Sequence, residues 1–127
     1  MSDRLAYECL LTELHAARME GSLERLSALF APDAQFRIAG ASDGKPISIH
    51  AQGIDAIRPW LVMLVKTFRL SNYCLQSRAI DGDRAAVHWR ADIHSRITGS
   101  LVATELVDVV EVRESKILAY TEFFVPG

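Results

Sequence analysis

The stretch that decides the fold is Val102–Phe124, which reads VATELVDVVEVRESKILAYTEFF. It is rich in β-branched and aromatic residues, as paired strands are. The short polar segment Arg113–Ser115 interrupts it and has the composition of a tight turn. We therefore predict a hydrophobic β-hairpin, with its two strands on either side of a three-residue loop.

This hairpin carries two acids on a face that should be apolar. With a three-residue loop, Asp108 lies opposite Tyr120, and Leu106 lies opposite Glu122. All four side chains then share one face, with the two carboxyls within about 5 to 8 Å of each other. A one-residue change of register would instead put the two acids on opposite faces. The predicted arrangement indicates a pocket without identifying a reaction.

Length and charge narrow the class of protein. The 127 residues fit one domain, expected to span residues 1–127, and 50% of them are hydrophobic. The formal net charge of -2 gives no electrostatic reason to expect binding to nucleic acid or to an anionic membrane. No stretch approaches the roughly 18 apolar residues of a membrane span, and no leader pattern opens the chain. We expect a cytoplasmic protein.

The remaining chain predicts helices first and strands afterwards. Helical spacing of apolar residues covers 3–20, a second helix follows a cap at Ser22 and ends by Pro32, and a third runs from Gly53 to about Thr67. Short strands are expected at 34–39 and 47–51, and from Leu70 the chain reads as a four-stranded antiparallel meander. The predicted fold is α+β: a cone-shaped, curved antiparallel sheet packed on three helices and enclosing a pocket.

Three segments carry a family resemblance: GSLERLSALFAPDAQF at 21–36, HAQGIDAI at 50–57 and SKILAYTEFF at 115–124. With the order of elements, they resemble the cone-shaped superfamily of nuclear transport factor 2, ketosteroid isomerase and the SnoaL-like cyclases. The resemblance spans nearly the whole chain and is strongest with the SnoaL-like branch. It implies the fold rather than a reaction, because this superfamily contains enzymes, binding modules and transport factors.

Comparison with ketosteroid isomerase disfavours that activity. Its general base would fall on Ile38, which cannot take a proton. Its oxyanion-hole tyrosine would fall on Leu14, and two further pocket tyrosines on Phe30 and Leu61. Only the acid of the oxyanion hole has a counterpart, at Asp108, and in that family this carboxyl is kept protonated by an apolar site.

Comparison with limonene epoxide hydrolase suggests epoxide hydrolysis, a third candidate after acid/base catalysis on a carbonyl compound and binding without catalysis. Arg90 and Asp92 resemble its Arg-x-Asp pair, and Glu122 falls at the position of its last-strand aspartate. Phe36 and Ile38 replace the tyrosine and asparagine that hold its water. SnoaL-like cyclases place their working acid at the same last-strand position, so the resemblance singles out Glu122.

Epoxide hydrolysis would need Arg90 and Asp92 to point into the pocket. The strand around Trp89 tests this, because its apolar and polar residues alternate. The apolar set is the expected inward face, which would leave Arg90 and Asp92 on a solvated or dimer-facing stripe. His88 and His94 do not suggest a metal site with Asp92, because His88 and Asp92, four residues apart on a strand, are separated by about 13 Å. His15, beside Leu14, could act as a base but is more typical of a structural residue.

These observations lead to two interpretations, an enzyme and a protein that binds without catalysis, of which the enzyme is preferred. The preferred one is a SnoaL-like pocket protein that acts on a small apolar carbonyl compound by acid/base catalysis, of isomerase, cyclase or lyase type. Glu122 would be the acid/base, Asp108 a hydrogen-bond donor to an oxyanion, and Tyr120 its orienter. No metal or organic cofactor is expected. The expected pocket lining is Leu14, Phe36, Ile38, Trp60, Trp89, Leu106 and Phe124.

The other interpretation is a module without catalysis, which binds a small apolar molecule or associates through the outer face of its sheet. The lack of an acid at position 38 and the apolar pocket floor favour it. A homodimer is expected in either case.

Overall fold

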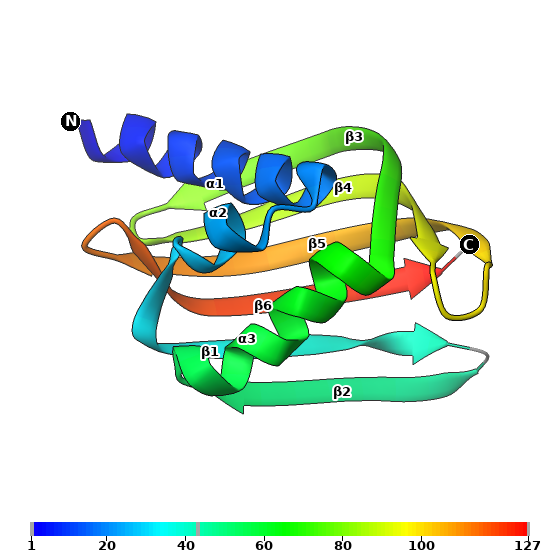
Figure 1. Ribbon diagram of the computed structural model, residues 1–127. Coiled ribbons are helices and arrows are strands. Elements are labelled where there is room, and N and C mark those ends of the chain that lie inside the picture. Colours follow the sequence, from blue (N-terminus) through cyan, green and yellow to red (C-terminus); the bar gives the residue numbers. More distant parts are fainter. Residues whose placement is uncertain (1, 43, 127) are drawn as a thin grey trace.

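The computed structural model describes residues 2–42 and 44–126. Figure 1 shows the helices packed on one side of a curved sheet that is not closed. The elements follow in the order α1 (Ser2–Glu20), α2 (Leu23–Ser27), β1 (Phe30–Ser42), β2 (Lys45–Gln52), α3 (Ile54–Val62), the π-helical segment η1 (Met63–Thr67), β3 (Phe68–Asp81), β4 (Arg84–Ser95), β5 (Leu101–Arg113) and β6 (Lys116–Pro126).

The six strands form one sheet in the order β2-β1-β6-β5-β4-β3. The predicted antiparallel meander is present as β3 to β6, and it is continued by β1, which pairs with β6 in parallel. The sheet is therefore mixed, not purely antiparallel as predicted. The α+β class and the curved sheet on three helices agree with the sequence prediction.

The second helix is shorter and β1 is longer than predicted. α2 ends at Ser27, and β1 already begins at Phe30, before Pro32. The reason is a contact with a distant part of the chain: Phe30 pairs with Ile117 of β6, and the amide of Ile117 donates to the carbonyl of Leu29 at 2.7 Å. Local helix propensity gives way to this tertiary pairing.

The hairpin of β5 and β6 differs from the prediction in register but not in the face that it buries. Its turn has two residues, Glu114 and Ser115, both with positive φ, as a type I′ turn requires. A bulge follows, so that Asp108 pairs with Glu122 rather than with Tyr120, and Leu106 pairs with Phe124. The difference amounts to two residues, and because side chains alternate with period two, the inward face is kept.

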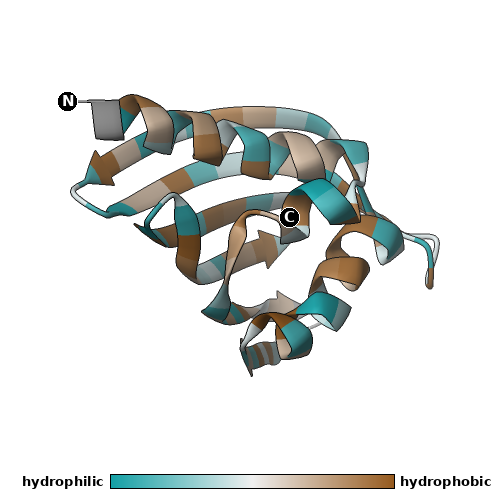
Figure 2. Ribbon diagram, turned by 60° about the vertical axis from the view of Figure 1, so that its left-hand side comes forward, coloured by the Kyte–Doolittle hydropathy of each residue, from teal (hydrophilic) through white to brown (hydrophobic). Residues whose placement is uncertain are grey.

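The core lies between the helices and the concave face of the sheet. Residues of alternating hydropathy along the strands, visible in Figure 2, bury one side of each strand. α1 contributes Leu11, Leu14 and Ala17 to this core. It ends at Glu20 and is followed by Gly21, whose φ of 69° suits a residue without a side chain. Charged side chains are also buried between α1 and the sheet, and the candidate site is formed by them.

Candidate functional site

Charged and polar side chains from three elements meet beneath α1. His15 and Arg18 lie nearly one helical turn apart on its buried face, only 5% and 3% exposed. Opposite them, Asp108 of β5 is fully buried, and Glu122 of β6, its cross-strand partner, is 4% exposed. Four ionisable groups thus share an interior where unpaired charges would be costly.

Arg18, Glu122 and Tyr120 form one half of this cluster. Arg18 Nη1 is paired with Glu122 Oε1, and the Tyr120 hydroxyl donates to the same oxygen at 2.8 Å. Arg18 Nη1 also lies 3.4 Å from that hydroxyl. The ring of Tyr120 stacks on Phe36 with centroids 5.6 Å apart, which fixes the direction of its hydroxyl. Glu122 Oε1 is therefore fully engaged, whereas no hydrogen bond from the described residues reaches Oε2.

Burial controls the protonation of this half. It raises the pKa of Glu122; Arg18 acts in the opposite direction and Asp108 in the same one, and the net shift is upward. Burial, followed by the two carboxylates, also raises the pKa of Tyr120, which stays a neutral donor. Burial opposes the charge of Arg18, but Glu122, Tyr120 and Asp108 raise its pKa, so it stays a cation. Glu122 is thus a carboxyl that takes a proton more readily than an ordinary one.

His15, Asp108 and Tyr73 form the other half. His15 Nε2 lies 2.8 Å from Asp108 Oδ2, and His15 Nδ1 lies 2.7 Å from the hydroxyl of Tyr73 on β3. A neutral imidazole donates from one ring nitrogen and accepts at the other, so the tautomer of His15 sets the direction of both hydrogen bonds. Asp108 Oδ1 is buried without a partner among the described residues.

Trp89 of β4 lies between the two halves. Its fully buried ring is 4.6 Å from the ring of His15 and 5.4 Å from Arg18 Cζ, a cation–π distance. Its indole Nε1 and Arg18 Nε are buried and unpartnered among the described residues. Unsatisfied polar atoms of this kind reduce stability and are rare in the cores of native proteins.

A cavity of about 390 Å³ opens beside the Arg18–Glu122 pair, and we call it the main cavity. Its walls come from α1, β1, β2, η1, the start of β3 and the ends of β4 to β6. Arg18 and Glu122 are its charged groups, and most of the rest is apolar. Gly40 allows this packing, because a Cβ there would lie 2.5 Å from the Phe124 ring. The cavity is lined by Arg18, Ile38, Ile47, Ile49, Met63, Leu64, Phe68, Ile93, Ser95, Ser100, Val102, Thr104, Glu122, Phe124 and Pro126.

The structure brings some of the predicted site residues to this cavity. Glu122, Ile38 and Phe124 line it. Asp108 does not, since its carboxylate is enclosed by His15 and the sheet. Tyr120 contacts Glu122 from the core side. The other expected lining residues are elsewhere because the helices pack closely over the middle of the sheet: Leu14, Phe36, Trp89 and Leu106 lie in the core, and Trp60 is half-buried at its edge.

Sequence reasoning missed Arg18 and Tyr73. Arg18 continues the apolar stripe of Tyr7, Leu11 and Leu14 along α1, and a cation in such a stripe is a signal of a buried partner. No comparable local signal marks Tyr73, whose contact with His15 depends on a bulge in β3 next to Asn72, a residue with positive φ.

The pair proposed by analogy with epoxide hydrolase faces away from the main cavity. Arg90 is exposed, and half-buried Asp92 accepts a hydrogen bond from Asn72 at 2.7 Å on the outer side of the sheet. Val87, Trp89 and Ala91 of β4 are buried, as their alternation predicted. Epoxide hydrolysis required Arg90 and Asp92 to point inward. The structure therefore removes this candidate.

Metal-binding clusters and membrane-spanning helices are both absent from the described part of the chain. Within residues 2–42 and 44–126, no group of three or more His, Cys, Asp or Glu side chains could hold a metal ion. Over the same residues, no helix is long and apolar enough to cross a membrane.

Comparison with known proteins yields one family match and many similar folds. Residues 11–120 match the profile of the SnoaL-like domain. A candidate isomerase from Rhodopseudomonas palustris shares 17% identity with a TM-score of 0.76, covering 94% of this chain and 88% of its own. A candidate isomerase from Bacillus subtilis shares 22% identity with a TM-score of 0.74 and the same coverage.

A candidate polyketide cyclase from Sinorhizobium meliloti shares 25% identity with a TM-score of 0.60, covering 89% of this chain and 92% of its own. No curated protein matches this chain at a significant level.

Proposed function

Because the chain belongs to the SnoaL-like family, we propose that it binds a small, largely apolar carbonyl compound in the main cavity and moves a proton next to the carbonyl. The reaction would be an isomerisation or a cyclisation, with Glu122 as the acid/base. The observation that carries the proposal is Glu122 itself, a carboxyl with a raised pKa at the polar end of an apolar cavity.

The two carboxyl oxygens of Glu122 have different roles in this proposal: one is held in place and the other transfers the proton. Oε1 is held by Arg18 and Tyr120, which fixes the carboxylate plane. Oε2, with no such bond from the described residues, is the oxygen available to a substrate proton. A raised pKa brings Glu122 closer to neutral pH, where a group that both takes and returns a proton is most effective. Tyr120 is the orienter in this scheme.

Arg18 supplies the charge that the reaction needs. When Glu122 removes a proton next to a carbonyl, negative charge develops on the carbonyl oxygen. Arg18 lines the same cavity and uses Nη1 for its contacts with Glu122 and Tyr120. Its Nη2 group has no hydrogen bond to the described residues and can donate to that oxygen. We therefore assign the oxyanion to Arg18 rather than to Asp108, whose role would be to hold His15.

Exchange of substrate hydrogen for solvent deuterium tests this proposal directly. The protein is incubated in D₂O with a panel of small ketones, enones and β-keto esters, and deuterium at the α-carbon is followed by NMR. We expect catalysed exchange for at least one compound, and a loss of about 100-fold or more in the Glu122→Gln variant, with binding retained. Glu105→Gln, the same change on the exposed face of β5, is the matched control.

A module that binds without catalysis is the second candidate. It is favoured by the engagement of Glu122 with Arg18 and by the apolar Ile38 at the position of an isomerase base. Saturable binding of panel compounds without any exchange, in parent and Glu122→Gln protein alike, would select it over the acid/base proposal.

We also propose that the protein is a cytoplasmic homodimer. The outer face of the sheet exposes neighbouring apolar residues on β5 and β6: Val109 is 38%, Phe123 39% and Val125 64% exposed. Apolar patches on an exposed sheet are typical of contacts between protein chains. The small-molecule partner and the dimer use opposite faces of the sheet, so neither excludes the other.

A further inference from the structure

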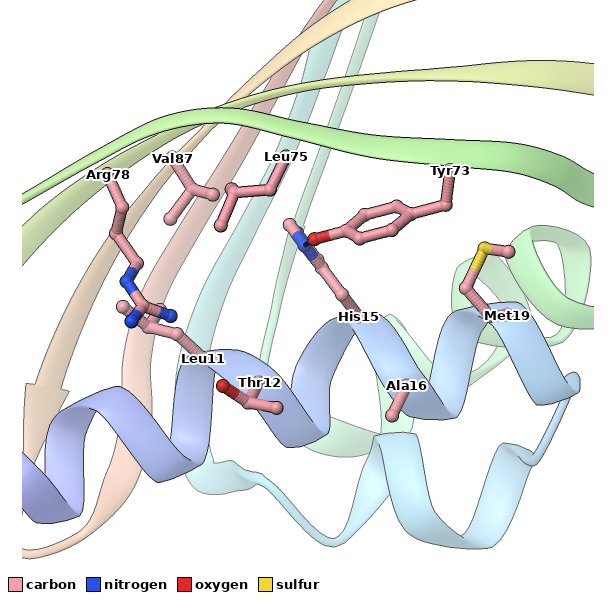
Figure 3. Close-up of a pocket in the computed structure, with 9 residues that line it drawn as sticks. All are labelled: Leu11, Thr12, His15, Ala16, Met19, Tyr73, Leu75, Arg78 and Val87. Carbon is pink, nitrogen blue, oxygen red and sulfur yellow. Dashed lines mark hydrogen bonds between the residues drawn. The ribbon is translucent and has the colours of Figure 1, made fainter.

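A second cavity, of about 330 Å³, lies between α1 and the strands β3 and β4. Figure 3 shows Leu11 and His15 of α1 pointing toward β3, and Tyr73 and Arg78 of β3 pointing back toward the helix. Apolar groups make up most of its surface, as in ordinary small-molecule sites. It is lined by Leu11, Thr12, His15, Ala16, Met19, Tyr73, Leu75, Arg78 and Val87.

Arg78 distinguishes this cavity from a packing defect. It is half-buried, extends from β3 toward α1, and takes part in none of the ion pairs among the described residues. No Asp or Glu from the described part of the chain lines the cavity, whereas in the main cavity Arg18 is neutralised by Glu122. An uncompensated guanidinium beside an apolar wall gives the second cavity a positive end.

Two other polar groups of the cavity are already partnered. His15 and Tyr73 are hydrogen-bonded to each other at 2.7 Å, and His15 is also bonded to Asp108. Burial and Asp108 raise the pKa of Tyr73, whereas Arg78 lowers it. The positive charge of Arg78 is therefore close enough to act on the Tyr73 hydroxyl. Arg78 is therefore the charged group left to bind a ligand.

The two cavities are separate sites. Trp89 is fully buried between them, with its ring 5.6 Å from Tyr73 on one side and 5.4 Å from Arg18 Cζ on the other. Of the residues that the structure describes, none lines both cavities. A molecule in the second cavity would touch His15 and Tyr73 without reaching Glu122.

We propose that the second cavity binds a small organic carboxylate, with the anion on Arg78 and an apolar body between α1 and β4. The planar guanidinium matches a carboxylate with two parallel hydrogen bonds, and Thr12 lines the same cavity. Leu11, Leu75 and Val87 form the apolar wall. A chain of about six carbons fits a cavity of this volume at the small end of ligand sites.

Titration with hexanoate tests this proposal, followed by amide chemical shifts and calorimetry on the full chain. Hexanol, inorganic phosphate and acetate separate the contributions of charge and apolar body. We expect the largest shifts in residues 11–19 and 73–78. We also expect Arg78→Gln to weaken hexanoate binding about tenfold or more, the usual effect of removing one partner of a charged hydrogen bond.

Three variants serve as controls for the site and for the charge. Arg69→Gln makes the same change at an exposed position of the same strand and should alter affinity less than about twofold. Ala16→Phe should block the cavity and abolish binding. Ile47→Val, in the wall of the main cavity, should leave hexanoate binding unchanged. Equal affinity of parent and Arg78→Gln protein, shifts concentrated around Glu122, or phosphate binding as tightly as hexanoate would each overturn the proposal.

Discussion

Single residues decide whether the interior of this protein is stable. Glu122 and Arg18 are 4% and 3% exposed and are bonded to each other, so each offsets part of the cost of burying the other. Their pairing is thus a condition for folding as well as a device for chemistry. A variant that removes one partner leaves the other charge without compensation.

Arg18→Met should therefore destabilise the protein by about 3 to 5 kcal/mol, because it leaves Glu122 buried and unpaired. Adding Glu122→Gln should restore much of this loss, since the remaining groups are then neutral. Urea unfolding of the two single variants and the double variant measures the coupling. A loss below about 1 kcal/mol in Arg18→Met would show that the pair is not buried as described.

The raised pKa of Glu122 also predicts a dependence of stability on pH. Above the ordinary value of 4.5 and up to its folded-state pKa, the native protein holds this proton while the unfolded chain has lost it. The free energy of unfolding should then fall as pH rises through this window. Glu122→Gln should lack that part of the decline. If the parent and the variant have parallel pH profiles between about pH 4 and 7, the pKa of Glu122 is not raised.

At the scale of elements, the β5–β6 hairpin sets the position of Glu122. Glu114 and Ser115 have φ values of 51° and 65°, a conformation that favours Asn and Gly. The chain accepts some backbone strain at this turn, and the bulge that follows restores the pairing of the long strands. Register depends on both features together.

Replacing Glu114–Ser115 by Asn–Gly should stabilise the protein by about 0.5 to 1 kcal/mol without changing the site, because both new residues accept positive φ. Thermal unfolding gives the change in stability. Ser100→Gly, in the β4–β5 loop, where no positive φ requires glycine, is the control and should not stabilise. A gain equal to that of the control would mean that the turn is not of this type.

Some of these elements could be predicted from the sequence, and others could not. The meander and the helix α1 could be predicted because alternation and helical spacing are local patterns. The start of β1 at Phe30 could not, since it depends on pairing with Ile117, far along the chain. Likewise Glu122 could be singled out by the hairpin and the family resemblance. Its partner Arg18 is marked only by its place in the apolar stripe of α1, a pattern that indicates burial but not which strand the residue contacts.

At the scale of the whole molecule, the protein has three candidate binding surfaces: two cavities on the helical side of the sheet and one apolar patch on its outer side. The helices and the concave face enclose the main cavity, α1 and β3 border the second one, and the convex face carries the apolar patch around Phe123. Each surface has a distinct chemistry: a buried ion pair, an uncompensated cation and exposed apolar side chains. Binding at one surface leaves the other two accessible.

The convex face should hold two copies together. Phe123→Glu places a charge in the centre of the proposed contact and should convert the dimer into a monomer, as measured by light scattering during size-exclusion chromatography. Ile97→Glu adds the same charge at a loop position that is 80% exposed and should leave the dimer intact. A monomeric parent protein would refute the dimer.

The proposed chemistry depends above all on Glu122 being a desolvated acid with a raised pKa at the end of the main cavity. A carbon NMR titration of carboxyl-labelled protein measures this pKa, with Glu122→Gln to assign the resonance. We expect a midpoint for Glu122 clearly above 4.5. A midpoint at or below 4.5 would show that Arg18 outweighs burial, leaving Glu122 a permanently charged structural partner and contradicting its role as acid and base.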